Sequence, residues 1–284
     1  MKRSWNRWAG KWIQIECNTK RGKLMGSLSY HRPKTIKETL ALMEKGVPLA
    51  GGTALTPKRS DVTAVIDLQD LKLDEFSVGK SEIRIGATVK LQALIKAQGE
   101  IPQALAQACR QEAALNIRNA ATIGGAVMTG DGRSPLLTAL LSLDASVVTE
   151  PGKKSEPLEK LLEKRGDKRK LRLIVTLVMM RPDRMAYEQV SRSPADRPLV
   201  CLAVAEKLTS KGESHVVAAL GGYGERPIRL TRMEEALEKG ASLAEAAAFA
   251  EKAYSDAGDA FASAAYRAEI AGILARRLLT EVKG

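Results

Sequence analysis

Two pairs of adjacent glycines, each close to a threonine, restrict the backbone of this chain more than any other feature of its sequence. Gly51-Gly52 precedes Thr53, and Gly124-Gly125 follows Thr122. Glycine reaches positive φ without a steric penalty and lets a ligand approach the main chain closely. Successive free N–H groups in such a turn form a concave site for a phosphate, and threonine hydroxyls can donate to its oxygens. Each pair follows an apolar or helical stretch, so both pairs are predicted to lie in loops.

Either pair alone could be no more than a tight turn, because short motifs of this kind match by chance. Two such segments in one domain suggest instead a diphosphate that is held from two sides. No Gly-Lys-Ser/Thr follows Gly51-Gly52, so this segment is not a P-loop. Gly221-Gly222-Tyr223-Gly224 lacks the spacing of a Rossmann fingerprint. The glycine pairs are therefore either two plain turns or the two halves of one phosphate site.

Length and composition indicate a globular protein. At 284 residues, 44% of them hydrophobic, the chain can bury a large core or form two domains. No apolar run approaches the ~20 residues that cross a bilayer, and no signal peptide is evident. Cys17, Cys109 and Cys201 lie far apart, and only two histidines occur. This pattern argues against a metal or iron–sulfur site and against a disulfide framework, and it predicts a protein of the reducing cytoplasm.

Half of the net charge of +12 lies in the first residues of the chain. Residues 1–24 carry seven basic side chains and one acid, Glu16, together with Trp5, Trp8 and Trp12. This spacing would place the tryptophans on one face of a helix that could bind a membrane or a partner. The favoured interpretation is a basic extension that is disordered or precedes a translation start at Met25. In the remainder, dispersed charge and few aromatic residues argue against nucleic-acid binding.

Short strands alternate with helices along the chain, which predicts an α+β fold. Arg181-Pro182-Asp183 interrupts the pattern and predicts a domain boundary. Before it, strands are expected at 28–30, 47–50, 64–67, 76–78, 83–85, 145–148 and 171–179, with helices at 35–45, 88–98, 102–113, 136–143 and 158–164. After it, strands at 185–190, 200–207 and 215–220 precede helices at 231–239, 242–256 and 262–281. The predicted organisation is an extension at 1–24 and two domains at 25–181 and 182–284.

The residues around the glycine pairs resemble those of a known family. The segments that carry the resemblance are Ala50-Gly51-Gly52-Thr53, Ala64 to Leu68, Ile83 to Ala87, Ile117 to Gly125 and Leu136 to Ala145. In this order they resemble the FAD-binding subunit of the molybdenum hydroxylases, the medium subunit of bacterial xanthine dehydrogenase and carbon monoxide dehydrogenase-type enzymes. The resemblance runs from about Ser27 to the end of the chain. It implies a two-subdomain FAD-binding domain of the PCMH type, followed by a small antiparallel sheet with a three-helix bundle.

The resemblance implies that the two glycine segments hold the pyrophosphate of FAD. The N–H groups of residues 51–54 would face one phosphate; those of 123–125, with the Thr122 hydroxyl, would face the rest of the diphosphate and the ribityl chain. The isoalloxazine ring would lie between the two domains. The residues implied in cofactor binding are Leu49, Ala50, Gly51, Gly52, Thr53, Ala54, Leu55, Thr56, Thr122, Ile123, Gly124, Gly125, Ala126 and Asp131. No catalytic side chain is implied, because the electron-transfer chemistry belongs to the flavin.

Three positions depart from the family pattern. Ala126 replaces a frequent Asn, Pro135 stands where many members have Asp, and Glu188 stands where some have Lys. Asp131 could supply the missing carboxylate from an earlier turn, or it could be a solvated turn residue before Gly132. The departures concern flavin affinity and the position of the ring, and they leave the phosphate segments unchanged.

The resemblance also implies a place in a larger enzyme. The chain would pass electrons from a 2Fe–2S small subunit to an external acceptor. It would form a heterotrimer, or a dimer of heterotrimers, with that subunit and a molybdopterin-binding large subunit. One alternative is a scaffold subunit of the same complex with a weak or empty flavin site. Another is an unrelated module that binds phosphate or nucleic acid.

Overall fold

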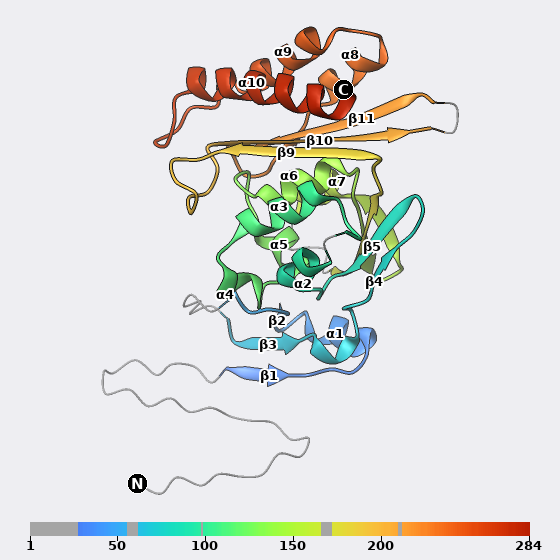
Figure 1. Cartoon of the computed structure of the whole chain (residues 1–284). Helices are drawn as coiled ribbons and strands as arrows, with labels where there is room; N and C mark the ends of the chain where they lie inside the picture. The colour runs from blue at the N-terminus through green and yellow to red at the C-terminus, as the bar shows by residue number, and fades with distance from the viewer. Residues whose placement is uncertain (1–27, 56–61, 98, 166–171, 210–211) are drawn as a thin grey trace, which may run out of the picture.

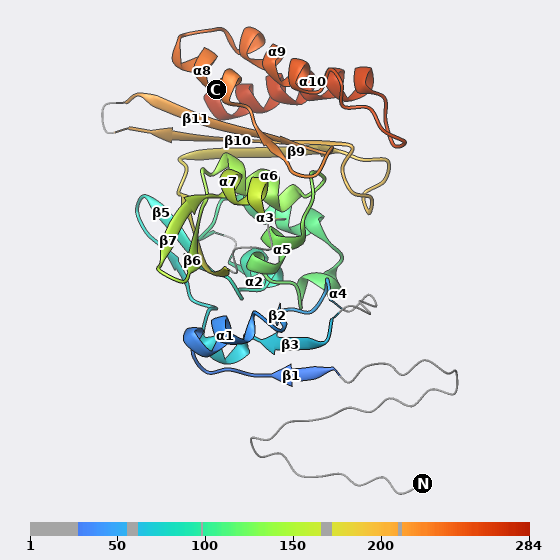
Figure 2. The same ribbon diagram turned by 180° about the vertical axis from the view of Figure 1, so that it is seen from behind.

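The elements of this computed structural model are stacked in layers along one long axis (Figures 1 and 2). The structure describes residues 28–55, 62–97, 99–165, 172–209 and 212–284. The predicted extension at 1–24 and the candidate residue Thr56 lie outside these ranges. None of the described helices is both long and apolar enough to cross a bilayer.

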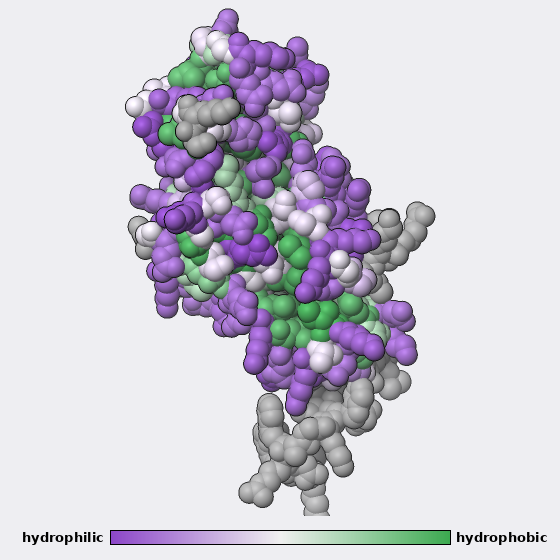
Figure 3. All heavy atoms as spheres, turned by 90° about the vertical axis from the view of Figure 1, so that its right-hand side faces the viewer, coloured by the Kyte–Doolittle hydropathy of each residue, from purple (hydrophilic) through white to green (hydrophobic). Residues whose placement is uncertain are grey.

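The first layer is a parallel sheet with the strand order β1-β3-β2. It consists of β1 (Ser29–His31), β2 (Val47–Leu49) and β3 (Ala64–Asp67), with α1 (Ile36–Leu42) beside it. Strand β2 lies at the edge of this sheet. After Leu49 the chain leaves the sheet and enters the first glycine segment. In Figure 3, apolar side chains gather at the height of α1 and β3. There, α1 and β3 pack with β8 in a small core around Ile66.

The second layer is an antiparallel sheet with the order β4-β5-β8-β6-β7. Its strands are β4 (Phe76–Val78), β5 (Glu82–Gly86), β6 (Ser146–Glu150), β7 (Lys154–Pro157) and β8 (Leu173–Met180). The helical elements that accompany it are η1 (Gln69–Leu71), α2 (Leu91–Lys96), α3 (Gln103–Glu112), α4 (Leu115–Arg118), α5 (Ile123–Thr129), α6 (Pro135–Ser142) and α7 (Leu158–Lys164). Every residue of α6 is buried, as its apolar sequence predicts.

The third layer is an antiparallel sheet with the order β12-β11-β10-β9, covered by three helices. Its elements are β9 (Arg184–Val190), β10 (Val200–Leu208), β11 (Ser214–Gly221), β12 (Ile228–Arg229), α8 (Thr231–Glu238), α9 (Leu243–Ala253) and α10 (Ala264–Lys283). The predicted α+β class, with a C-terminal antiparallel sheet and three helices, is confirmed. The predicted boundary falls in the connection between β8 and β9.

The third sheet lies between α3 and α6 on one side and α9 and α10 on the other (Figure 1). Alternate side chains of β10 point to opposite faces, as the pleat of a strand requires. Cys201, Ala203 and Ala205 belong to the core that contains α6, whereas Val200, Leu202 and Val204 pack with the C-terminal helices. The small residues on the α6 side let this helix approach the sheet closely. The two predicted domains therefore share one hydrophobic core.

Candidate cofactor site

The first glycine segment is a turn whose main-chain donors are partly free. Gly52 has a φ of 72°, a conformation that favours glycine. The Leu55 N–H donates to the Gly52 carbonyl at 3.0 Å and closes the turn. Within the described part of the chain, the N–H groups of Gly51, Thr53 and Ala54 donate to no protein acceptor. Three open donors in one turn fit the predicted contact with a phosphate.

The second glycine pair lies in a helix, and the prediction of a loop there is wrong. Thr122 is the N-cap of α5, and its hydroxyl accepts a hydrogen bond from the Gly125 N–H at 3.2 Å. The Ile123 N–H donates to the Val89 carbonyl and the Gly124 N–H to the Ala87 carbonyl, both at 2.9 Å. Threonine is a preferred N-cap, and this cap together with the hydrogen bonds to Val89 and Ala87 offsets the low helix propensity of the two glycines.

The expectation that the N–H groups of Ile123, Gly124 and Gly125 face a diphosphate is therefore not met, because all three already have protein acceptors. Thr122, Ile123 and Gly124 are also buried, whereas Gly125 and Ala126 are partly exposed. The surface that this segment offers a ligand is thus the start of α5 at residues 125–126. A Cβ at Gly125 would meet only the Thr122 hydroxyl, at 3.0 Å, so the space beside it is open.

Gly124, the other glycine of the second pair, allows close packing against Ala87. A Cβ at Gly124 would lie 2.8 Å from the Ala87 carbonyl oxygen and 2.9 Å from the Ala87 Cβ. Thr122 also forms an isolated antiparallel bridge with Lys90. These contacts tie residues 121–124 to residues 87–91 and fix the N-terminal end of α5.

The two glycine segments meet at Gly51. A Cβ at this position would lie 1.9 Å from the carbonyl oxygen of Ala120 and 3.1 Å from the Cα of Ala121. Only glycine allows this approach of two backbones. The structure therefore brings the open donors of the first segment against the residues that lead into α5. This is the juxtaposition that a ligand held from two sides requires.

Asp131 has protein partners in place of an open site. Arg197 binds its carboxylate with two nitrogens, one of them at 2.8 Å, and the Arg133 N–H donates to it at 2.8 Å. Burial raises the pKa of the Asp131 carboxyl, but Arg197 and the Arg133 N–H outweigh burial and lower the pKa overall. The Asp131 carboxylate therefore fits neither expectation: it is bound to Arg197 and the Arg133 N–H, so it is neither a free ligand for the ribityl chain nor a solvated turn residue.

Two of the departures from the family pattern have structural roles. Pro135 occupies the first turn of α6, where a missing N–H leaves no helical hydrogen bond unmade. Glu188 on β9 forms an ion pair with Arg277 of α10 at 2.9 Å.

Lys90 is a candidate binding residue that the sequence did not reveal. It is exposed and lies directly opposite Thr122 in the isolated bridge. Side chains of directly opposed residues in an antiparallel pair point to the same face. The bridge therefore places the Lys90 side chain on the same face as the Thr122 side chain, near the N-terminal end of α5. No local signal marks this lysine, because the bridge joins residues far apart in sequence.

Among the described residues, the two cysteines are buried and the possible metal ligands are dispersed. No group of three or more His, Cys, Asp or Glu residues there is placed to hold a metal ion. Burial raises the pKa values of the Cys109 and Cys201 thiols to about 12, so both are neutral near pH 7. The arrangement offers main-chain donors at residues 51, 53 and 54 and the cation of Lys90 to an anionic ligand.

Comparison with known proteins identifies the class to which this fold and site belong. The family model for the FAD binding domain in molybdopterin dehydrogenase matches residues 25–180, and that for the CO dehydrogenase flavoprotein C-terminal domain matches residues 185–282. The chain belongs to this FAD-binding family. FAD as the cofactor and an oxidoreductase subunit of the molybdopterin dehydrogenase type are thereby confirmed.

Individual relatives support the assignment over nearly the whole chain. The uncharacterized protein YgfM of Escherichia coli (strain K12) is 33% identical, over 89% of this chain and 95% of its own. The carbon monoxide dehydrogenase medium chain of Afipia carboxidovorans is 28% identical, over 91% of this chain and 97% of its own. The structure of quinoline 2-oxidoreductase from Pseudomonas putida 86 matches with a TM-score of 0.77 at 19% identity, over 91% and 97% of the two chains, which shows the shared fold.

Proposed function

We propose that this chain is the flavin subunit of a molybdenum hydroxylase and passes electrons from a 2Fe–2S subunit to an external acceptor. The observation that carries the proposal is the close approach of Gly51 to Ala120, which lies two residues before Thr122 and the second glycine pair. Membership of the FAD-binding family supports the identity of the ligand. Bound FAD supplies the electron-transfer chemistry, so the chain itself needs no nucleophile or general base.

The residues present fit the phosphate end of this cofactor. The N–H groups of Gly51, Thr53 and Ala54 would donate to phosphate oxygens, with the Thr53 hydroxyl beside them. Gly125 and Ala126 leave room for the ligand at the start of α5, and Lys90 would supply a compensating charge. The contacts of Leu49, Ala50, Leu55, Thr56 and Thr122 with the cofactor remain predictions.

The proposed partner subunits are those expected for a flavin subunit of a molybdenum hydroxylase. No group of three or more His, Cys, Asp or Glu residues in the described part of the chain is placed to hold a metal ion. Carbon monoxide dehydrogenase is among the enzymes whose medium chain is a relative. We propose that the chain assembles with a molybdopterin-binding large subunit and a 2Fe–2S small subunit, as a heterotrimer or a dimer of heterotrimers. The cytoplasm stays the predicted compartment.

Titration of the purified full-length chain with FAD tests the proposal. One equivalent is expected to bind per chain, and Gly51→Ala is expected to lose it because its Cβ must displace the loop from Ala120. Gly79→Ala is the control, since its Cβ would meet only Glu82 in the β4–β5 hairpin, at 3.2 Å. A stable wild-type chain that binds no FAD would contradict the proposal.

Co-expression with a 2Fe–2S subunit and a molybdopterin-binding subunit from the same genome tests the assembly. The chain is expected to co-purify with the two partner subunits, and hydroxylation of a substrate by the purified chain alone would show that the assignment of roles is wrong.

A further inference from the structure

The C-terminal end of α5 is joined to the loops of the third sheet through the main chain. The Gly132 N–H donates to the Gly224 carbonyl at 3.1 Å, and the Gly222 N–H donates to the Gly132 carbonyl at 2.7 Å. A Cβ at Gly132 would lie 1.9 Å from the Tyr223 carbonyl oxygen. The turn that follows α5 therefore lies directly against the loop that follows β11.

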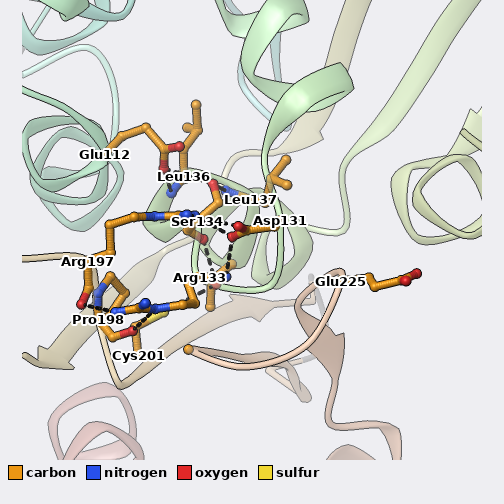
Figure 4. A network of polar contacts seen from close by, with 12 residues as sticks. Glu112, Asp131, Arg133, Ser134, Leu136, Leu137, Arg197, Pro198, Cys201 and Glu225 are labelled. Atoms are coloured by element: carbon orange, nitrogen blue, oxygen red, sulfur yellow. Dashed lines mark hydrogen bonds and ion pairs between the residues drawn. The ribbon is translucent and has the colours of Figure 1, made fainter. Parts of the chain in front are cut away.

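Side chains strengthen the same junction (Figure 4). Arg197 binds the Asp131 carboxylate with two nitrogens. Arg133 donates to the Pro198 carbonyl at 3.0 Å and to the Arg197 carbonyl at 2.8 Å, and its guanidinium lies 4.5 Å from the ring centre of Phe261. We call Asp131, Arg133 and Arg197 the α5 clamp.

Helix α6 continues from the clamp and is fixed separately. Glu112 at the end of α3 accepts hydrogen bonds from the Ser134 hydroxyl at 2.8 Å and the Leu136 N–H at 2.9 Å. Leu136 and Leu137 are fully buried in the shared core. The shared core therefore holds α6 against the third sheet independently of the clamp.

The ion pair between Arg197 and Asp131 is expected to contribute little to the stability of the fold. The side chains of Arg197 and Asp131 are 49% and 46% exposed, and ion pairs at such exposed positions contribute little to the free energy of unfolding. What the clamp does connect is the turn after α5, at residues 131–133, with the segment that precedes β10. The N-terminal end of this helix is fixed by residues 87–91, so the two ends have independent attachments.

We propose that Asp131, Arg133 and Arg197 are positioning residues for the part of the FAD site that lies beyond the phosphates. This inference rests on the proposed function. Helix α5 has seven residues and is therefore ~10 Å long. If the phosphates of FAD lie beside Gly125 and the cofactor runs along α5, its other end would reach the turn at 131–134 and the loops of the third sheet. The clamp sets the mutual position of these surfaces, and Asp131 acts through Arg197 without touching the cofactor.

The test compares two ligands on the purified full-length chain. FAD requires both ends of the site, whereas ADP carries only the adenosine diphosphate part and probes the phosphate end. Arg133→Ala and Arg197→Ala are expected to raise the dissociation constant of FAD about fivefold, the size of one exposed charged contact, and to change the visible circular dichroism of bound FAD. The ADP dissociation constant, measured by competition, should stay within about twofold.

Controls separate positioning from folding. Arg84→Ala removes an equally exposed ion pair, 3.0 Å from Glu82, and should change neither ligand affinity nor the dichroism spectrum. Arg197→Ala should keep the melting temperature within about 2 °C, because it removes only an exposed ion pair. Asp131→Asn combined with Arg197→Ala should cost no more FAD affinity than either change alone, because both remove the same pair.

Three outcomes have distinct meanings. Clamp variants with the affinity and dichroism of wild type overturn the inference. Equal losses of FAD and ADP affinity also overturn it, because the phosphate end is then affected. A wild-type chain that binds neither ligand overturns the proposed function itself.

Discussion

Replacing Gly125 by alanine separates cofactor binding from folding at the centre of the candidate site. Gly125 lies in the first turn of α5 and is not among the glycines with positive φ. Alanine in a helix is more stable than glycine by about 0.5–1 kcal/mol. The new Cβ would meet the Thr122 hydroxyl at 3.0 Å, and this close contact offsets part of the gain. The free energy of unfolding should therefore change by less than about 1 kcal/mol.

The effect on the ligand should be larger than the effect on the fold. The added methyl group occupies the open side of α5, where the phosphate is proposed to approach. Loss of one good contact corresponds to about 1.4 kcal/mol, a tenfold rise in the FAD dissociation constant. Gly124→Ala should behave differently, because its Cβ would lie 2.8 Å from the Ala87 carbonyl oxygen. We expect it to destabilise the fold by about 1–3 kcal/mol through overpacking.

Both variants and the Gly79→Ala control are compared with wild type in two measurements. Flavin fluorescence titration gives the FAD dissociation constant, and thermal unfolding gives the stability. Unchanged FAD affinity in Gly125→Ala would refute the placement of the phosphate at the start of α5. A large loss of stability in the same variant would refute the assumption that the space beside Gly125 is open.

Three further changes test other parts of the structure. Lys90→Ala should weaken FAD binding and reduce its dependence on ionic strength, as shown by titrations at several salt concentrations, whereas Lys90→Arg should keep both. In a Cys17→Ser variant at pH 8, Cys109 and Cys201 should resist a thiol reagent until the protein unfolds, because burial raises their pKa values to about 12; rapid labelling of the native state would contradict the packing. Deleting residues 1–24 should leave flavin content and melting temperature unchanged, and a large drop in either would show that this segment packs on the domain.

Local signals account for the parts of the fold that the sequence predicted well. Helix α9 begins at a capping box in which Ser242 and Glu245 satisfy each other's N–H groups, and such a signal needs only four residues. The first glycine segment is equally local, because its positive φ and its open donors depend on residues 51–54. These features could be predicted because no distant part of the chain competes for them.

The second glycine segment shows what local reasoning misses. From the sequence, the Thr122 hydroxyl is expected to face a phosphate, whereas the structure shows it as the N-cap of α5. The acceptors for Ile123 and Gly124, at Val89 and Ala87, lie more than thirty positions earlier. Neither interpretation of Asp131, as a cofactor contact or as a solvated turn residue, includes its partner Arg197, which is 66 positions away. Tertiary partners determined the outcome in each case.

The shared core leads to a last prediction about the boundary near residue 182. In residues 25–181 alone, α6 would lose the sheet that covers it, although all eight of its residues are buried in the full chain. In residues 182–284 alone, Cys201, Ala203, Ala205 and Ala219 would be exposed on one face of the sheet. Exposed apolar surface of this extent favours association over a stable monomer. Each fragment expressed alone should therefore aggregate or lack a cooperative unfolding transition, whereas co-expression should give a soluble complex that binds FAD. Two separately stable, monomeric fragments would show instead that the contacts of α6 with the third sheet contribute little to folding.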